Sequence, residues 1–222
     1  MSIHRLLVSG DGSHTILNSE LNETYHSHHG AMQESEYVFI KNGLDLIVEK
    51  TINVFEVGFG TGLNGLLTLH HSCMKAKSIN YITLEPYPLD IRLVKELNYT
   101  ESTQLSPFKE KFYKMHSAEF SHEIQMQNFC FLKIKSRLED YSYVPGFADI
   151  IYFDAFAPSK QSEIWDFSNI EKLYAILKPG GILVTYCAQG QFKRNLKQAS
   201  FIVETLPGPP GKKEMTRGIK EK

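Results

Sequence analysis

The side chains best suited to chemistry follow apolar segments that end in a glycine-rich turn or in an acid. Gly58, Gly60 and Gly62 alternate directly after an apolar segment that ends at Val57. Glycines at such positions let backbone N–H groups approach a ligand where a Cβ would collide. A helix predicted over residues 63 to about 70 points its positive end at the same place. The segment therefore predicts a site for a nucleotide-like ligand.

The spacing of the glycines distinguishes two classes of ligand. Residues 60–65 match the G-x-G-x-x-G fingerprint of dinucleotide-binding enzymes. Counted from the strand end at Val57, however, the turn begins at Gly58, and the third fingerprint position is Leu63 instead of glycine. The alternative, E-x-G-x-G-x-G from Glu56, resembles the first motif of class I methyltransferases that bind S-adenosylmethionine. We favour this interpretation over a dinucleotide site and over a turn that only packs strand on helix.

Two further acids end predicted strands. Glu85 closes an apolar strand and lies 23 residues after Gly62. A carboxylate there can accept hydrogen bonds from ribose hydroxyls, in adenosylmethionine and in NAD alike. Asp154 ends the apolar strand 149–154. Because ligands bind outside the carboxyl ends of strands in such sheets, Asp154 is well placed for chemistry, although it can also simply cap the turn after its strand.

The elements that position these residues alternate as in a Rossmann-like α/β fold. We expect a mostly parallel seven-stranded sheet whose last strand is antiparallel, because the rigid turn 207–211 folds that strand back. The first predicted strand ends at Val57, and the later predicted strands cover 80–85, 129–134, 149–154, 182–186, 201–206 and 213–217. The predicted helices after the first one cover 88–97, 164–177 and 193–199.

The first 50 residues lie outside this alternation. They predict a small elaboration, with short strands at 14–17 and 36–40, that builds one wall of a substrate cleft. A methyltransferase domain is expected over 51–222, and the two parts together are expected to form one structural domain. His26, His28 and His29 lack the helical i,i+4 spacing and the cysteine support of a zinc site. We expect them to be polar loop residues and expect no metal.

Composition indicates a folded cytoplasmic protein. Of the 222 residues, 42% are hydrophobic and 22% charged, and no apolar run approaches the length of a membrane span. The amino terminus lacks the apolar core of a signal peptide. Three isolated cysteines, without a C-x-x-C pair, fit reduced thiols and no zinc site. We therefore expect neither a membrane partner nor a metal cofactor.

The charge is unevenly distributed. The net charge is −1, but residues 191–222 carry eight lysines and arginines against three acids. A basic carboxyl-terminal quarter is a weak indication of phosphate contact, and a solvated lysine-rich tail explains the charge equally well.

Motifs spread over nearly the whole chain resemble the MnmC-type tRNA methyltransferase family. The most specific is Asp154-Ala-Phe-Ala-Pro158 with Lys160 and a tryptophan five residues beyond that lysine. The other matching segments are Tyr25-His26-Ser27, Gly30-Ala31, Glu34-Ser35, Val38-Phe39, the glycine motif through Asn64, Glu85 with Pro88-Leu89, Pro179-Gly-Gly181 and Lys212-Lys-Glu-Met215. In many bacteria this domain is fused to a flavin oxidase domain, and we expect the stand-alone form here.

The resemblance implies transfer of a methyl group from S-adenosyl-L-methionine to the primary amine of 5-aminomethyl-2-thiouridine at the tRNA wobble position. The product is 5-methylaminomethyl-2-thiouridine. Asp154 is the candidate that orients the amine and receives its proton. The resemblance implies cofactor contacts at Glu56, Gly58, Gly60, Thr61, Gly62, Asn64, Glu85, Asp140 and Asp154.

The same resemblance implies which residues hold the anticodon loop. Phe156, Tyr25 or Trp165 stacks on the flipped-out base, although Trp165 is as well explained as a core residue. Basic groups hold the RNA backbone, although ordinary solvated lysines explain them too. The implied substrate contacts are Tyr25, His26, Ser27, Glu34, Phe156, Pro158, Lys160, Trp165, Lys212 and Lys213.

Two segments depart from the family pattern. The third strand usually ends in an acid or amide near the adenine, yet here it runs into Ser136-Arg137-Leu138, so that Glu139, Asp140 or backbone groups must serve instead. Lys160-Gln-Ser-Glu163 replaces the family's Lys-Asn-Pro-Glu, which loosens that loop. The alternatives are a methyltransferase for another amine or RNA position, a polyamine synthase of related fold, and a catalytically silent module that binds tRNA or the cofactor.

Overall fold

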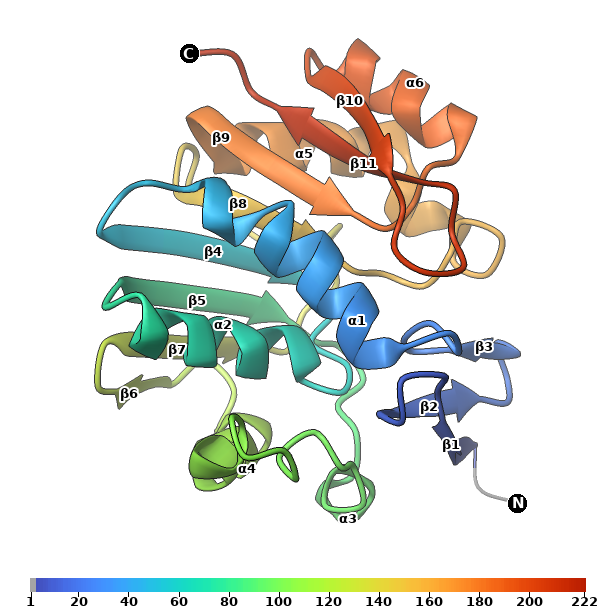
Figure 1. Ribbon diagram of the computed structural model, residues 1–222. Coiled ribbons are helices and arrows are strands. Elements are labelled where there is room, and N and C mark those ends of the chain that lie inside the picture. The colour runs from blue at the N-terminus through green and yellow to red at the C-terminus, as the bar shows by residue number, and fades with distance from the viewer. Residues whose placement is uncertain (1–2) are drawn as a thin grey trace.

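A central sheet of eight strands organises the molecule. The computed structural model describes residues 3–222, and Figure 1 shows the sheet with helices on both faces. The strand order is β10-β11-β9-β8-β4-β5-β7-β6. The strands are β4 (Thr51–Val57), β5 (Ser78–Leu84), β6 (Glu123–Met126), β7 (Phe129–Ile134), β8 (Ala148–Phe153), β9 (Leu177–Thr185), β10 (Ile202–Pro207) and β11 (Glu214–Ile219).

The inner strands are parallel because helices connect them. β9, β8, β4, β5 and β7 pair in parallel, whereas β11 is antiparallel to both β9 and β10. Every residue of β8 is buried, as expected for a strand covered on both faces. Alternate residues of β4 serve two cores: Ile52 and Val54 face one, Phe55 and Val57 the other.

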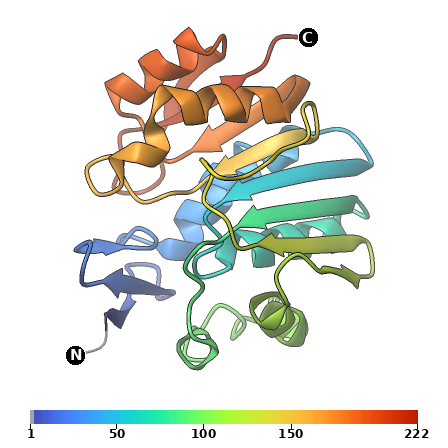
Figure 2. The same ribbon diagram turned by 180° about the vertical axis from the view of Figure 1, so that it is seen from behind.

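The helices form two layers. The face seen in Figure 1 carries α1 (Ala31–Ser35), η1 (Glu36–Lys41) and α2 (Leu63–Met74). The opposite face, turned forward in Figure 2, carries α5 (Phe167–Ile176) and α6 (Gly190–Gln198). The shorter elements are η2 (Leu44–Leu46), α3 (Ile91–Val94), η3 (Ser106–Phe108), α4 (Lys109–Ser117) and η4 (Ser162–Trp165).

The predicted fold class is confirmed, with one added strand. β6 forms an antiparallel hairpin with β7 through Gln127, whose φ is +60°. The sequence prediction missed β6 because its four residues, Glu123–Met126, include only two apolar side chains. The expected turn 207–211 does return the last strand antiparallel, from β10 into β11.

One local prediction was wrong, and two predicted helices differ from the structure in extent. Residues 36–40, expected as a strand, continue α1 as the π-helix η1, which buries Val38 and Phe39 in the core. The helix expected over 88–97 shrinks to α3, where Asp90 caps the amino end by accepting from the Arg92 N–H. The helix predicted over 164–177 is instead a 3₁₀ turn, η4, followed by α5.

The amino-terminal segment lies beside the carboxyl ends of the parallel strands. β1 (His4–Val8), β2 (His14–Asn18) and β3 (Glu23–Thr24) form a separate antiparallel sheet. Figure 1 shows it below the point where α1 begins, on the side to which β4 and β5 point. The division into residues 1–50 and 51–222 stays a prediction.

Candidate functional site

The parallel register brings three predicted site residues together. Val57 pairs with Leu84 on one side and with Phe153 on the other. The next residue on each strand is therefore Gly58, Glu85 or Asp154, all at the same edge of the sheet. Two backbone hydrogen bonds align these strand ends. The Gly58 N–H donates to the Leu84 backbone oxygen at 3.0 Å, and the Asp154 N–H donates to the Val57 backbone oxygen at 3.1 Å.

A cavity of about 690 Å³ opens at this edge. That volume is in the range of small-molecule and cofactor sites. Five segments line it: part of the amino-terminal sheet and the loop after it, the glycine turn, the segment after β5, the segment after β7, and the segment after β8. Lys212 and Tyr186 contribute from the carboxyl-terminal quarter. The edge of the sheet and the amino-terminal layer thus enclose the site together.

The glycine turn has the backbone that only glycine adopts easily. The φ angles of Gly58, Gly60 and Gly62 are +93°, +49° and +73°. A Cβ on Gly58 would lie 2.6 Å from the backbone oxygen of Asp154, and a Cβ on Gly60 would lie 2.9 Å from the Tyr25 ring. Gly58 and Gly60 line the cavity, whereas Gly62 begins α2 behind it.

Glu85 ties the second strand end to the glycine turn. Its Oε2 accepts from the Gly60 N–H at 2.8 Å and its Oε1 accepts from the Tyr87 N–H at 2.7 Å. Burial raises the pKa of this carboxyl, and the two N–H donors oppose that rise. A carboxylate has about four acceptor positions, so Glu85 retains capacity for ligand hydroxyls on the cavity side.

Asp154 belongs to a chain of three polar side chains. Its Oδ2 accepts from Asn64 Nδ2 at 2.7 Å, and the same Nδ2 lies 3.2 Å from Glu56 Oε1. Burial raises the pKa of Asp154 to about 7, an effect that the Asn64 hydrogen bond reduces. Burial also raises the pKa of Glu56 to about 8. Asp154 reaches the cavity, but Glu56 is fully buried and Asn64 is 2% exposed, and neither lines it.

Aromatic and charged side chains surround the cavity near Asp154. Tyr25 and Phe156 pack edge to face, with ring centroids 5.0 Å apart. Lys212 Nζ lies 2.6 Å from Glu34 Oε2 and 3.7 Å from the centroid of the Tyr186 ring. The Glu34 side chain is only 6% exposed, whereas that of Lys212 is 31% exposed, so the carboxylate end of this ion pair is withdrawn from water.

The loop after β3 is joined to the glycine turn and to the base of α1. His26 Nε2 lies 2.6 Å from Thr61 Oγ1, and burial lowers the pKa of His26 to about 4. The ring is therefore neutral near pH 7. The Ser27 N–H donates to Glu34 Oε1 at 3.1 Å, so that Glu34 holds this loop as well as Lys212.

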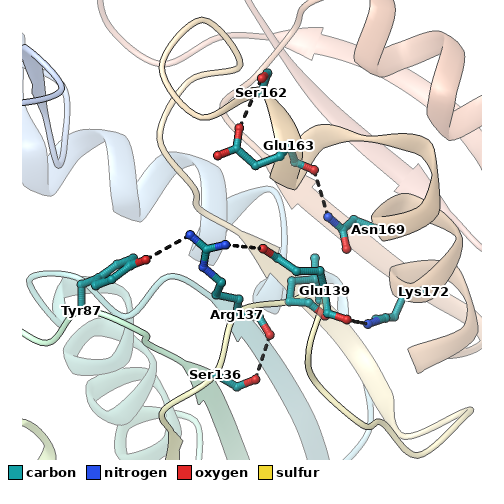
Figure 3. A network of polar contacts seen from close by, with 9 residues as sticks. Tyr87, Ser136, Arg137, Glu139, Ser162, Glu163, Asn169 and Lys172 are labelled. Atoms are coloured by element: carbon teal, nitrogen blue, oxygen red, sulfur yellow. Dashed lines mark hydrogen bonds and ion pairs between the residues drawn. The ribbon is translucent and has the colours of Figure 1, made fainter.

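The segment after the third parallel strand presents an arginine. Figure 3 shows Arg137 between Tyr87 and Glu139, and its guanidinium nitrogens lie 3.1 Å from the Tyr87 hydroxyl and 3.1 Å from Glu139 Oε1. Lys172 fixes the loop by donating to the Glu139 backbone oxygen at 2.7 Å. Arg137 and Glu139 line the cavity, whereas Asp140 is exposed outside it.

Besides Glu56, Gly62 and Asn64, four further predicted site residues lie outside the cavity lining. Trp165 is 4% exposed and packs on Phe153 with ring centroids 4.4 Å apart. Its Nε1 donates to the Phe156 oxygen, so it supports the loop after β8 instead of presenting a face to a base. The others are Asp140, Pro158 and Lys213, while Lys160 does line the cavity.

Sequence reasoning gave no role to Tyr186 or Arg137, although both line the cavity. Tyr186 was predicted as the last residue of the strand 182–186, but β9 ends at Thr185, so that Tyr186 lies just beyond the strand end, where ligands bind in such sheets. Arg137 follows β7 closely and was noted only as a departure from the family pattern.

Most basic side chains of the carboxyl-terminal quarter are engaged within the chain. Lys193 lies 2.7 Å from Glu214, Arg217 Nε lies 2.7 Å from Glu204, and Lys212 pairs with Glu34. Lys220 donates to two backbone oxygens at the end of α5 and the start of β9. The charge excess at this end of the sequence therefore does not form a free basic patch of the same size.

Within residues 3–222, no three histidine, cysteine, aspartate or glutamate side chains are grouped so that they could hold a metal ion. None of the helices in the same range is long and apolar enough to cross a membrane.

Comparisons with known proteins agree with this geometry. A family model described as S-adenosyl-L-methionine-dependent methyltransferase matches residues 95–221. The tRNA 5-methylaminomethyl-2-thiouridine biosynthesis bifunctional protein MnmC of Leptospira interrogans is 29% identical over 92% of this chain, and that of Pseudoalteromonas atlantica is 28% identical over 99%. This chain spans about a third of the length of these relatives, 33% and 34%.

Solved structures show the same fold. MnmC2 from Aquifex aeolicus superposes with a TM-score of 0.79 at 20% identity, covering 98% of this chain and 70% of that one. Spermidine synthase from Thermotoga maritima gives a TM-score of 0.57 at 14% identity, covering 99% and 70%. At these identities the likeness concerns the fold alone, and it confirms the predicted class I methyltransferase architecture.

Proposed function

This chain belongs to the S-adenosyl-L-methionine-dependent methyltransferases, and from that premise we propose that it methylates the primary amine of 5-aminomethyl-2-thiouridine at the wobble position of tRNA. The names of the MnmC relatives supply the substrate class. The observation that carries the proposal is Asp154, an acid at the end of β8 that faces the cavity beside the glycine turn. Since the proposed substrate is a tRNA, we infer a cytoplasmic site of action.

The residues around the glycine turn fit a cationic nucleoside cofactor better than a dinucleotide. In a pyrophosphate site the turn amides face the anion, but here the Gly60 N–H is bonded to the Glu85 carboxylate. Glu85 and Asp154 add negative charge, which repels phosphate and attracts the sulfonium and ammonium groups of adenosylmethionine. When bound, that cofactor supplies an activated methyl group. We propose that Gly58, Gly60 and Glu85 hold it.

The chain's own residues then have to present a neutral amine. A primary amine attacks only when it is unprotonated, and it must lose a proton after attack. Asp154 can accept a hydrogen bond from the amine, orient its lone pair and receive that proton. Lys212 and Glu34 line the same space as an ion pair, so their opposite charges largely offset each other beside the amine.

The cavity walls can exclude water and hold a base. Tyr25, Phe156 and Tyr186 supply aromatic surface, on which a flipped-out pyrimidine can stack. Lys160 is exposed at the cavity and is the lysine best placed for a phosphate of the anticodon loop. Positioning and desolvation are then the main sources of rate, because donor and nucleophile are both reactive.

Labelled methyl transfer tests this proposal. We expect the purified protein to label tRNA that carries the aminomethyl group and not the same tRNA lacking it. Equal labelling of both would reject the acceptor and favour a methyltransferase for another position. No labelling together with intact cofactor binding would favour a silent binding module. Asp154→Asn is the matched control, since it preserves the shape of the side chain and removes its basicity.

A further inference from the structure

We propose that Asn64 and Glu56 act on the reaction through Asp154, as positioning residues, instead of holding the cofactor directly. This inference rests on the proposed function, since it assigns Asp154 the role of accepting the amine proton. The family resemblance implied that both residues contact the cofactor. Their positions in the fold favour a different role.

Neither Glu56 nor Asn64 is accessible from the cavity. Glu56 lies on β4 two residues before the glycine turn and has no exposed surface. Asn64 is in the first turn of α2 and is 2% exposed. Neither side chain lines the cavity, whereas Gly58, Gly60 and Asp154 do. A ligand in the cavity meets Asp154 without meeting the two residues behind it.

The Asn64 amide is bonded to both carboxyl groups. One amide nitrogen, Asn64 Nδ2, lies 2.7 Å from Asp154 Oδ2 and 3.2 Å from Glu56 Oε1. An amide NH₂ has two donors, so it can bond both carboxyl groups at once. Thr68 secures the backbone of the same residue by donating its hydroxyl to the Asn64 oxygen at 2.7 Å. The rigid start of α2 thus fixes the orientation of Asp154 relative to the glycine turn.

This arrangement has two consequences for Asp154. Because Asn64 donates to Oδ2, the other oxygen, Oδ1, can accept a hydrogen bond from the substrate amine in the cavity. The hydrogen bond also favours the ionised carboxylate and opposes the effect of burial. The charged groups that act on Asp154 are Glu34 from α1 and Lys212 from the β10–β11 turn, while Asp154 in turn raises the pKa of Glu56 on β4.

Glu56 completes the arrangement by holding the other donor of the Asn64 amide. Its Oε1 faces Asn64, and the hydroxyls of Thr83 and Tyr81 also act on this carboxyl and lower its pKa against the effect of burial. A glutamine at this position retains an oxygen that can accept from Asn64, whereas a leucine of similar size does not. The pair Glu56→Gln and Glu56→Leu therefore separates the hydrogen bond from the space that the side chain fills.

The test compares Asn64→Ala, Asn64→Ser, Glu56→Gln and Glu56→Leu with the wild-type protein. Three quantities are measured: the Kd of S-adenosyl-L-methionine by calorimetry, kcat on aminomethyl tRNA, and the pKa of Asp154 by carboxyl ¹³C NMR titration. For Asn64→Ala we expect kcat to fall by ~10-fold or more while the Kd changes by less than ~3-fold, because orientation and not binding is lost. The pKa of Asp154 rises, because a donor to its charged form is gone. We expect Glu56→Leu to lower kcat in the same way as Asn64→Ala, and Glu56→Gln to lower kcat less.

The opposite pattern overturns the inference. If Asn64→Ala weakens cofactor binding as much as it lowers kcat, with the Asp154 pKa unmoved, then Asn64 is a cofactor ligand. Equal losses in Glu56→Gln and Glu56→Leu would remove Glu56 from the arrangement. Should Asn64→Ala fail to fold, Asn64→Ser carries the same comparison. If the wild-type protein does not methylate the tRNA, the proposed function fails, and the NMR titration still decides whether Asn64 governs Asp154.

Discussion

Replacing Asp154 by asparagine tests the proposed chemistry most directly. The substitution keeps the side-chain shape but removes the negative charge and the capacity to take a proton. A positioned general base contributes roughly 10²- to 10⁴-fold to a rate. We expect the lower end, a fall in kcat of ~10²-fold, because a neutral amine and a sulfonium already react readily. That fall corresponds to about 2.7 kcal/mol of transition-state stabilisation.

The pH dependence gives a second, independent signature of Asp154. Burial raises the pKa of this carboxyl to about 7, and the Asn64 hydrogen bond works against that rise. As a base it must be ionised, so the wild-type rate falls as the pH drops through this pKa, by about tenfold per unit at lower pH. A bound sulfonium cation favours the carboxylate, which places the midpoint of the loaded enzyme at or below 7.

The assay is single-turnover methyl transfer to aminomethyl tRNA at saturating cofactor, from about pH 5.5 to about pH 8.5. The substrate amine titrates in both proteins, so only the decline that belongs to Asp154 should be missing from Asp154→Asn. Circular dichroism over the same range shows that the variant stays folded. A variant rate within threefold (about 0.65 kcal/mol) of wild type would refute the assigned role. An identical acid decline in both proteins would do the same.

Three further changes have defined outcomes. The pKa of Glu56 is raised from 4.5 to about 8 in the folded protein, so ionisation of this carboxyl opposes folding between these two pH values. Glu56→Gln removes that ionisation and should therefore stabilise the protein relative to wild type, increasingly as the pH rises. Thermal unfolding at both ends of the window should show a difference in Tm between variant and wild type that grows with pH. Lys212→Ala should cost ~1–3 kcal/mol in chemical denaturation because it leaves the Glu34 carboxylate buried and unpaired, whereas the exposed Lys213→Ala should stay within about 0.5 kcal/mol; equal losses would contradict the difference in burial. Glu85→Ala should raise the cofactor Kd by ~10-fold or more in calorimetry, since bonds to a charged acceptor are worth ~1.5–3 kcal/mol, and an unchanged Kd would exclude Glu85 from the cofactor site.

The sequence predicted best where the determinants are local. The strand 129–134 and the two strand ends at Val57 and Phe153 follow from continuous apolar runs, and the structure places them within one residue of expectation. Residues 36–40 show where local pattern fails. Val38 and Phe39 suit a strand by type, but packing against the sheet draws them into a helix continuous with α1.

The site was predictable only in part, for a similar reason. A strand's end fixes the position of the next residue, so Glu85 and Asp154 could be expected at the same edge. Whether a side chain beyond a loop turns inward depends on distant contacts. Trp165 turns into the core against Phe153, and Asp140 turns to solvent although Glu139 beside it lines the cavity.

The sequence by itself determined the class of cofactor site, because the order strand, acid, alternating glycines and helix is a property of adjacent residues. The tertiary structure alone decided which polar side chains act together. Asn64 meets Asp154, 90 residues away, and Lys212 meets Glu34, 178 residues away. Such pairs arise only when the sheet aligns its strand ends and the amino-terminal layer closes over them. The spacing of these residues in the sequence therefore does not predict which of them are in contact.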